Sequence, residues 1–287
     1  MKRKTFFQFT TPSLLLMLLL MVFPLLTAAW LSLHFVTFRN LTTPEFIGLR
    51  NYVEVLGDAR FWQSLLFTLQ FIAITVPLQI ALGFAIALLL DQVGKRMRGF
   101  YFSALLLPYI VVPVVSTLMF RQLFDPSGLM NWVLRNLLGI RFFYSEASVK
   151  TLIMVHGVWY ATPFALIVLF AGLQTLPLEQ LEAAAIDGAN RLQQIRHVTL
   201  PHLSSLFSFV ALIGIMDAYR VFDSVFVLSQ QNPIYRAETL MVYNFQVALV
   251  FQRIGTANAM AILTVIGLLI VLIPFLLRTY REQTRGY

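Results

Sequence analysis

The stretch EQLEAAAIDGANRLQQIRHVTLPHL, residues 179–203, lies between two long apolar segments of an otherwise apolar chain. It holds three acids, two arginines and two histidines, and it is made largely of residues that suit helices rather than loops. If the apolar segments around it lie in lipid, a stretch of this kind predicts a structured element at the membrane surface. The composition of the chain supports that condition.

Lipid is the natural solvent for this composition. Of the 287 residues, 59% are hydrophobic, 26 are phenylalanine and only 12% are charged. A soluble domain has roughly 25% charged residues, and a single core does not bury so much apolar side chain. The chain has no cysteine, which excludes disulfides and thiolate metal sites. The net charge of +8 comes from basic residues scattered between apolar runs, which favours a membrane protein over a nucleic-acid-binding one.

Six segments are long enough to cross a bilayer, since a helical span needs about 20 apolar residues. The sequence therefore predicts an all-α integral membrane protein with six transmembrane helices. The predicted spans are residues 13–34, 61–90, 100–120, 151–173, 203–228 and 257–277, between tails at 1–12 and 278–287. The first span follows the basic residues MKRK, as in a signal peptide, but its apolar run is too long for one and no cleavage site stands out after it.

Basic residues near span ends predict the orientation, because they mark the cytoplasmic side. The turn GKRMRG (94–99) and the segment RTYREQTRGY (278–287) are the clearest indicators, and they place both termini and the 179–203 stretch in the cytoplasm. Prolines interrupt several spans, at Pro24, Pro77, Pro108, Pro113, Pro163 and Pro274. Membrane helices tolerate proline, but this number favours a bundle that bends and moves over a passive anchor.

The polar stretch itself predicts two short helices around a glycine turn. Pro177 suits a helix start, since its fixed φ is preorganised there. Gly188 interrupts the helical pattern, as glycine does where φ turns positive. Asn190 and Gln193 form a loose capping box for a second helix, which Pro201 is expected to end.

Physical reasoning alone leaves two interpretations of this stretch open. One is an amphipathic connector that rests on lipid, and the other is a docking element for a cytoplasmic partner. The three alanines at 183–185 favour docking, because small side chains let another surface approach closely.

The spacing of the stretch resembles the signature of permease subunits of bacterial binding-protein-dependent ABC importers: Glu-Ala-Ala, three residues, Gly, nine residues, then Ile-x-Leu-Pro. Here it reads Glu182-Ala183-Ala184, Gly188 and Val198-Thr199-Leu200-Pro201, with valine for isoleucine. The segments FIGLRNYVEVLGDARFWQSL, LFDPSGLMN, PFALIVLFAGLQTLP and YRVFDSVFVLS resemble the carbohydrate-uptake branch, and within it the first, maltose-transporter type of permease partner. At Ser229–Pro233 the chain has SQQNP where the family often has Gly-Gly-Pro, so the outer loop and substrate access are expected to differ there.

The resemblance implies a type I ABC importer permease fold in the bacterial inner membrane, with a cytoplasmic coupling helix in the loop 176–202 between the fourth and fifth spans. ATPase coupling would fall to Glu182, Ala183, Ala184, Asp187, Gly188, Leu200 and Pro201. The implied partners are a second permease subunit, two copies of a cytoplasmic ATP-binding subunit, a periplasmic solute-binding protein and a sugar or sugar-like solute. ATP and Mg²⁺ would be bound by the partner subunits, because this chain has no Gly-x-x-x-x-Gly-Lys-Ser/Thr loop.

Three charges interrupt the predicted fifth span. Asp217, Arg220 and Asp223 are three residues apart, which predicts that they share one helix face. A charge near the bilayer centre costs roughly 2.5–3.5 kcal/mol, so it is seldom without a role. Two roles stay open: mutual pairing, with Arg220 held between the acids, or a polar patch on the translocation path.

Polar and aromatic residues of the predicted fourth span are further candidates for the translocation path. They are His156, Trp159 and Tyr160. Aromatic faces suit sugar rings, although such residues also fill helix interfaces. His197 and His202 lack metal-ligand partners in the sequence and are interpreted as interfacial residues, so no metal site is expected.

The resemblance therefore implies a non-catalytic permease subunit that forms half of a sugar path in an ATP-driven importer. The alternative is a secondary transporter for a small polar solute, but no convincing internal repeat is present. An intramembrane enzyme would need a nucleophile, a base or a metal cluster within the spans, and no such set occurs. The sequence does not name the sugar.

Overall fold

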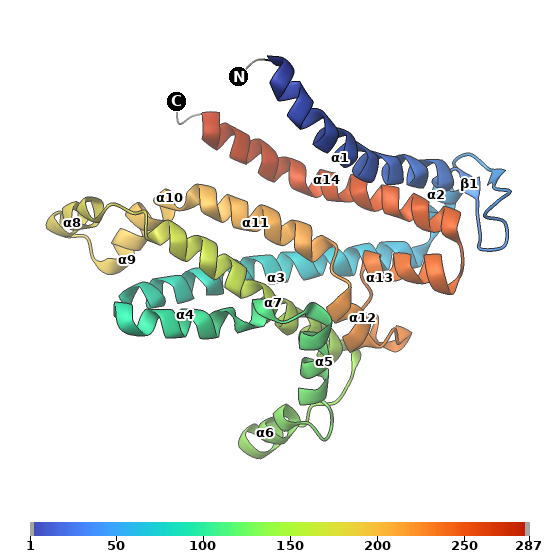
Figure 1. Ribbon diagram of the computed structural model, residues 1–287. Coiled ribbons are helices and arrows are strands. Elements are labelled where there is room, and N and C mark those ends of the chain that lie inside the picture. The colour runs from blue at the N-terminus through green and yellow to red at the C-terminus, as the bar shows by residue number, and fades with distance from the viewer. Residues whose placement is uncertain (1–2, 285–287) are drawn as a thin grey trace. The chain divides into compact units, whose positions relative to one another are not determined.

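The computed structural model describes residues 3–284, which are mainly helical and include two strands of two residues each (Figure 1). The chain divides into two compact units. Unit 1 holds Met1–Gln63 and Leu240–Leu269, and unit 2 holds Ser64–Thr239 and Ile270–Tyr287. The residues predicted for ATPase coupling and for the translocation path all lie in unit 2.

Within residues 3–284, four helices are long and apolar enough to cross a membrane, and they coincide with the first, second, fourth and sixth predicted spans. They are α1 (Arg3–Ser32), α3 (Ala59–Gln92), α7 (Glu146–Leu173) and α14 (Ile254–Thr284). Their apolar windows have mean hydropathies of 1.8 to 2.5. Helix α1 continues into the predicted tail 1–12, and α14 continues into the tail 278–287, of which residues 1–2 and 285–287 lie outside the described part.

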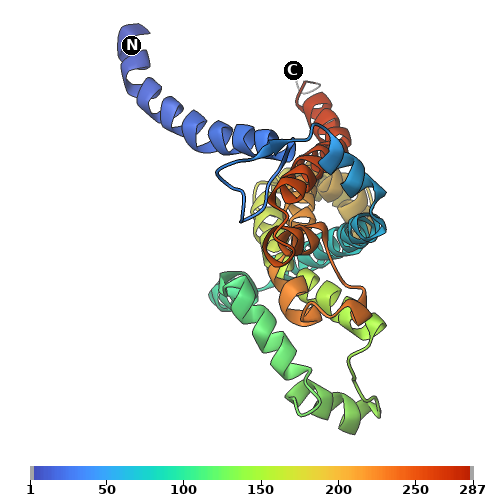
Figure 2. The same cartoon turned by 90° about the vertical axis from the view of Figure 1, so that its right-hand side faces the viewer.

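The predicted third span, residues 100–120, is not one straight helix. It consists of α4 (Lys95–Ile110) and α5 (Pro113–Leu123), which meet at a bend of 95° (Figure 2). Val112 is extended, with φ −56° and ψ 134°, because the ring of Pro113 disfavours helical geometry in the residue before it. Pro113 then starts α5, where its missing N–H costs nothing. Helix α5 leads into the short α6 (Leu129–Leu138).

The predicted fifth span, residues 203–228, is also broken. It falls on α11 (Ser204–Tyr219) and α12 (Asp223–Ser229). The chain enters it through α9 (Arg191–Gln194), a π-helical turn (Ile195–Thr199) and α10 (Leu200–His202). The segment Arg191–His202 meets α11 at a bend of 68°. Pro201 was expected to end the second short helix, but the helix runs on to His202 and the bend falls at Leu203. A second break separates α11 from α12.

The core of unit 2 is a cluster of small and branched apolar residues on α3, α7 and the start of α11. Its buried members are Ala87, Leu90, Leu166, Leu169, Leu173 and Leu203. Helices α3 and α7 touch closely, because a Cβ added at Gly83 would lie 2.6 Å from the Cβ of Ala165. Small residues allow such an approach between membrane helices, where dispersion contacts replace the hydrophobic effect.

Unit 1 is held together by a buried asparagine. Asn51, in α2 (Arg50–Gly57), donates to the carbonyl oxygens of Ser32 at 2.8 Å and His34 at 3.0 Å, and it accepts from Thr256 Oγ1 at 3.1 Å. The paired strands β1 (His34–Phe35) and β2 (Glu45–Phe46) lie beside it in sequence. Helix α13 (Leu240–Phe245) belongs to the same unit, where the Arg60 guanidinium lies 4.8 Å from the ring centre of Tyr243. These contacts connect the two distant segments of chain that form unit 1.

Candidate functional site

The predicted coupling stretch forms a compact helix–turn–helix. Helix α8 (Leu178–Ile186) begins after Pro177 and ends at Asp187. Gly188 follows with φ +82°, as the glycine in the pattern predicted. Its N–H bonds to the carbonyl of Ala185 at 3.0 Å, and the N–H of Ala189 bonds to the carbonyl of Ala184 at 2.9 Å. This is the paired hydrogen bonding of a Schellman motif, which satisfies the last carbonyl groups of the helix.

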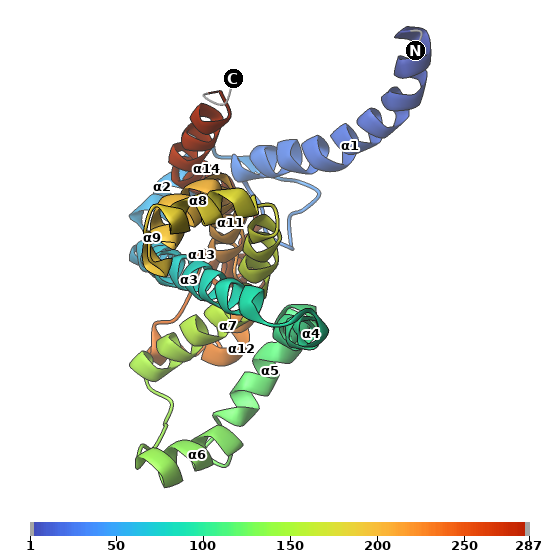
Figure 3. The ribbon, with the colours of Figure 1, turned by 90° about the vertical axis from the view of Figure 1, so that its left-hand side faces the viewer.

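The second half of the turn is fixed by side chains. Asn190 Oδ1 accepts from the N–H of Gln193 at 3.0 Å, while Gln193 Oε1 accepts from the N–H of Asn190 at 2.8 Å. The predicted capping box is therefore confirmed. Arg191 Nη1 also donates to Gln92 Oε1 at 3.1 Å, which joins the turn to the end of α3. In Figures 1 and 3, α8 and α9 lie side by side beyond the ends of α7 and α11.

The surface of this element is open. No residue of α8 is buried, and Glu182, Ala183, Asp187 and Gly188 are exposed, while Ala184 is half-buried. Leu200 and Pro201 are exposed as well. Three further large apolar side chains project from this element: Leu178 is 67% exposed, Ile186 is 87% exposed and Leu192 is 74% exposed.

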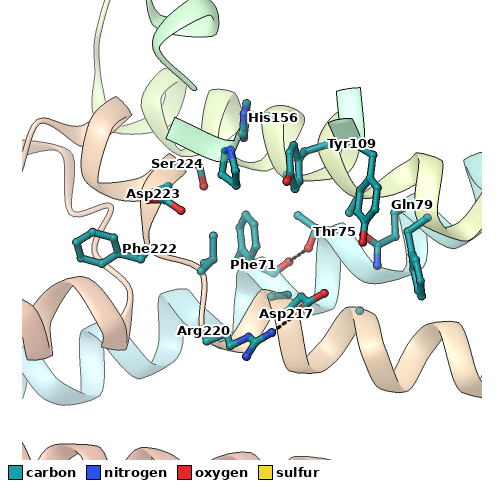
Figure 4. Close-up of a pocket in the computed structure, with 18 residues that line it drawn as sticks. Phe71, Thr75, Gln79, Tyr109, His156, Asp217, Arg220, Phe222, Asp223 and Ser224 are labelled. Atoms are coloured by element: carbon teal, nitrogen blue, oxygen red, sulfur yellow. Dashed lines mark hydrogen bonds and ion pairs between the residues drawn. The ribbon is translucent and has the colours of Figure 1, made fainter. Parts of the chain in front are cut away.

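A pocket of about 410 Å³ lies in unit 2 between α3, α4, α5, α7 and the segment from α11 to α12 (Figure 4). Of the residues predicted for the translocation path, it is lined by His156, Tyr160, Asp217, Arg220 and Asp223. Trp159 lies elsewhere, along an apolar groove with Pro108 and Met154. We call the first of these cavities the polar pocket.

The three charges do not share one helix face as their spacing predicted. Helix α11 ends at Tyr219, and Asp223 is the first residue of α12. Arg220 Nη2 bonds to Asp217 Oδ1 at 2.8 Å, and both side chains are more than half exposed. Among residues 3–284 no ion pair joins Arg220 to Asp223, so the expectation that Arg220 is held between two acids is wrong. Figure 4 shows the guanidinium turned toward Asp217.

His156 is buried against α5. Only 3% of it is exposed, and its Nε2 lies 3.0 Å from Ser116 Oγ and 3.4 Å from Thr117 Oγ1. The ring stacks with Tyr160 at 6.0 Å between centroids. Its Nδ1 is buried and has no hydrogen-bond partner in the described part of the chain. The two hydroxyl residues are about forty positions away in sequence, so no local pattern indicates that they meet His156.

Further polar residues line the same pocket. Thr75 and Gln79 project from α3, and Gln79 is 4% exposed despite its polar amide. Helix α11 comes close at this point, since a Cβ added at Gly214 would lie 2.3 Å from Gln79 Nε2. No signal in the sequence separates Gln79 from Gln63 and Gln70 in the same apolar span. Among the described residues, no group of three His, Cys, Asp or Glu side chains is placed to hold a metal ion.

The SQQNP departure takes a left-handed path. Gln230 and Gln231 have φ values of 51° and 55°, in the region that glycine adopts without strain. With its amide oriented to satisfy its neighbours, the side-chain oxygen of Gln230 accepts from Arg121 Nε at 3.2 Å and Nη2 at 2.8 Å. The loop therefore has the backbone conformation suited to a Gly-Gly pair, while a side-chain contact ties it to the end of α5.

The family that is described as the inner membrane component of binding-protein-dependent transport systems matches residues 60–285, so the chain belongs to this family. The resemblance inferred from the Glu182–Pro201 spacing is thereby confirmed.

Similar proteins and structures extend this result. The trehalose/maltose transport system permease protein MalF of Thermococcus litoralis is 33% identical over 92% of this chain and 90% of its own length. The arabinooligosaccharides transport system permease protein AraP of Bacillus subtilis is 29% identical over 94% of this chain and 87% of its own length. A chain of a bacterial ABC transporter involved in import of the acidic polysaccharide alginate superposes with a TM-score of 0.84, covering 96% of this chain and 95% of that one. At 20% identity, this last likeness shows the fold alone.

Proposed function

We propose that this chain is a permease subunit of an ATP-driven importer and forms half of the path for a sugar delivered by a solute-binding protein. The observation that carries the proposal is the 33% identity to a trehalose/maltose permease over 92% of the chain. The helix–turn–helix at 177–202 and the polar pocket supply the two parts such a subunit needs: a contact with an ATPase and a route for a polar solute.

The helix–turn–helix is the proposed docking element. Its exposed Glu182 pairs with a basic group of the ATP-binding subunit, and Ala183 allows close approach. The side chains of Ile186 and Leu192 enter the partner surface, where burial contributes about 1.5–3 kcal/mol for each. The Schellman turn and the capping box make this element rigid. A rigid element transmits a movement of the partner to α7 and α11, the helices on either side of it.

The polar pocket is the proposed part of the translocation path. Its volume of about 410 Å³ lies within the range of roughly 300–1,000 Å³ usual for small-molecule sites. Phe71, Tyr160 and Phe222 offer ring faces to the apolar faces of a sugar, while Thr75 and Gln79 offer hydrogen bonds to its hydroxyl groups. The unpartnered Nδ1 of His156 is a further hydrogen-bonding group beside the pocket.

In the assembly we propose, the two bent helix pairs each count as one span, giving six spans with both termini in the cytoplasm. A second permease subunit completes the path, and two ATP-binding subunits hold ATP and Mg²⁺. The basic turn at 94–99 and the exposed docking element then face the same, cytoplasmic side. The location is the bacterial inner membrane.

Reconstitution distinguishes this proposal from a secondary transporter. Vesicles would contain this chain, its second permease and the ATP-binding subunits, with ATP on one side and the loaded binding protein on the other. We expect labelled sugar to accumulate only when both ATP and binding protein are present. Accumulation by the chain alone, driven by a proton or sodium gradient, would replace the importer with the secondary transporter.

A further inference from the structure

We propose that the polar pocket selects solutes by charge: it admits an uncharged sugar and rejects an anionic one such as a uronate or a sugar phosphate. This inference rests on the proposed role of the pocket in translocation. It goes further because it specifies the chemical class of the solute.

The charged side chains that line the pocket do not balance. They comprise two carboxylates, of Asp217 and Asp223, and one guanidinium, of Arg220. Arg220 is already engaged, since its Nη2 donates to Asp217 Oδ1 at 2.8 Å. The remaining charge is the carboxylate of Asp223, which has no ion pair among the described residues. In Figure 4 this carboxylate lies apart from the Arg220–Asp217 pair and beside Ser224.

The place of Asp223 in the fold explains how an unpaired carboxylate is kept there. It is the first residue of α12, where exposed N–H groups and the helix dipole favour a negative charge. This stabilisation supplies no full positive charge, so the negative potential in the pocket is reduced but not cancelled. The other polar lining groups, which include Thr75, Gln79 and Ser224, are uncharged hydrogen-bonding groups.

An anionic solute meets two obstacles in such a pocket. Its charge is repelled by the carboxylate of Asp223. At a distance of about 6 Å and an effective dielectric constant between those of protein and water, this repulsion lowers the occupancy of the pocket by an anion roughly tenfold. In addition, the pocket offers the anion no free guanidinium. Carboxylates and phosphates are best recognised by a free arginine, and the arginine that lines the pocket is already paired. A neutral sugar meets neither obstacle and uses the hydroxyl, amide and aromatic groups.

The absence of cysteine from the chain makes a direct test practical. Ala161 lines the pocket and is half-buried, so Ala161→Cys places one thiol there. In the assembled transporter, the thiol would be labelled with two methanethiosulfonate reagents of similar size, one carrying trimethylammonium and one carrying sulfonate. Mass spectrometry of peptides from this chain would give the two rates. The ratio of the cationic to the anionic rate measures the charge preference of the pocket.

We expect the ratio to fall about a hundredfold when Asp223→Asn is added, because this change removes both a roughly tenfold repulsion of the anionic reagent and a roughly tenfold attraction of the cationic one. The matched control is Glu45→Gln, which removes the same charge from an exposed strand residue that does not line the pocket and should leave the ratio unchanged. A ratio that is indifferent to Asp223→Asn, or faster labelling by the anionic reagent in the parent variant, overturns the proposal. The second result would arise if the other permease subunit supplied an excess of positive charge.

A second measurement separates this inference from the proposed function. Maltose and trehalose would be compared with digalacturonate for their ability to slow labelling of the Ala161→Cys thiol. Protection by a neutral disaccharide and not by digalacturonate supports charge selection of a sugar, whereas protection by digalacturonate contradicts it. If no sugar protects while the reagents still show the Asp223-dependent ratio, the charge selection stands and the assignment of this pocket to sugar transport fails.

Discussion

Replacement of Gly188 tests whether the backbone of the coupling turn, rather than its side chains, transmits the ATPase cycle. Gly188 has φ +82°, and a Cβ built on it would meet no atom within 4 Å. The cost of a side chain therefore comes from backbone conformation alone, without a steric clash inside the chain. Alanine, asparagine and valine at this position differ mainly in how well they tolerate the left-handed region.

The expected magnitudes follow from that geometry. An alanine in the left-handed region costs about 1–2 kcal/mol, and about 1.4 kcal/mol shifts an equilibrium tenfold. Gly188→Ala should thus reduce the population of the native turn by about an order of magnitude relative to its alternatives. Gly188→Asn should cost less, because asparagine is enriched in this region, and Gly188→Val should cost most, because β-branched residues rarely enter it. The order of coupling efficiency is therefore glycine, asparagine, alanine, valine.

The assay is ATP-driven uptake and binding-protein-stimulated ATPase activity of the assembled complex in vesicles, at equal amounts of inserted chain. Gly94→Ala is the matched control: Gly94 also has open space around it but has φ −56°, so alanine there should be neutral. Wild-type uptake by Gly188→Val would refute the reasoning. An asparagine variant as defective as the valine variant would point to a side-chain contact with the partner instead.

Three further outcomes are expected. Arg220→Ala should lower the stability of the solubilised complex by less than about 1 kcal/mol, because its ion pair is exposed. In thermal unfolding, adding Asp217→Asn should restore this loss and adding Asp223→Asn should not. The reverse result would contradict the observed pairing of Arg220 with Asp217. Asn51→Ala should lower the free energy of unfolding by about 2–4 kcal/mol, because it leaves buried partners in unit 1 without their hydrogen bonds. A loss of less than about 0.5 kcal/mol, which is typical of a surface substitution, would argue against the buried network. A reporter fused after Tyr287 should be cytoplasmic, and a periplasmic signal would overturn the orientation.

Local patterns predicted the helix–turn–helix at 177–202 well because the forces that shape it are local. The positive φ of Gly188 and the capping box of Asn190 with Gln193 depend on neighbours in sequence, and both are present. The positions of the longest apolar helices were predicted equally well, because length and apolar composition alone define such helices.

Hydropathy did not predict the breaks in the third and fifth predicted spans. It depends on composition and carries no information about the direction of the helix axis. Pro113 marked one break, but Pro163 lies inside a continuous α7, so proline alone does not separate a bend from a tolerated kink. The break after Tyr219 moved Asp223 onto another helix and made the one-face prediction wrong.

Long-range contacts account for the remaining differences. The pairing of His156 with Ser116 brings together residues on two helices that the sequence separates by forty positions. The left-handed conformation of Gln230 is disfavoured for glutamine by itself, and its side-chain contact with Arg121 is visible only in the folded chain. Sequence patterns carry no information on partners of this kind.

Cross-linking gives the sharpest test of the proposed contact between the 177–202 element and an ATP-hydrolysing subunit. Ala183→Cys, on the exposed surface of α8, would carry a photoreactive benzophenone in the assembled complex, with Ser127→Cys in the exposed segment after α5 as the control. We expect illumination to join the Ala183 position to the ATP-binding subunit and not to join the Ser127 position to it. Products from Ala183→Cys that contain only lipid or the other permease subunit would show that the element does not dock on the ATP-binding subunit.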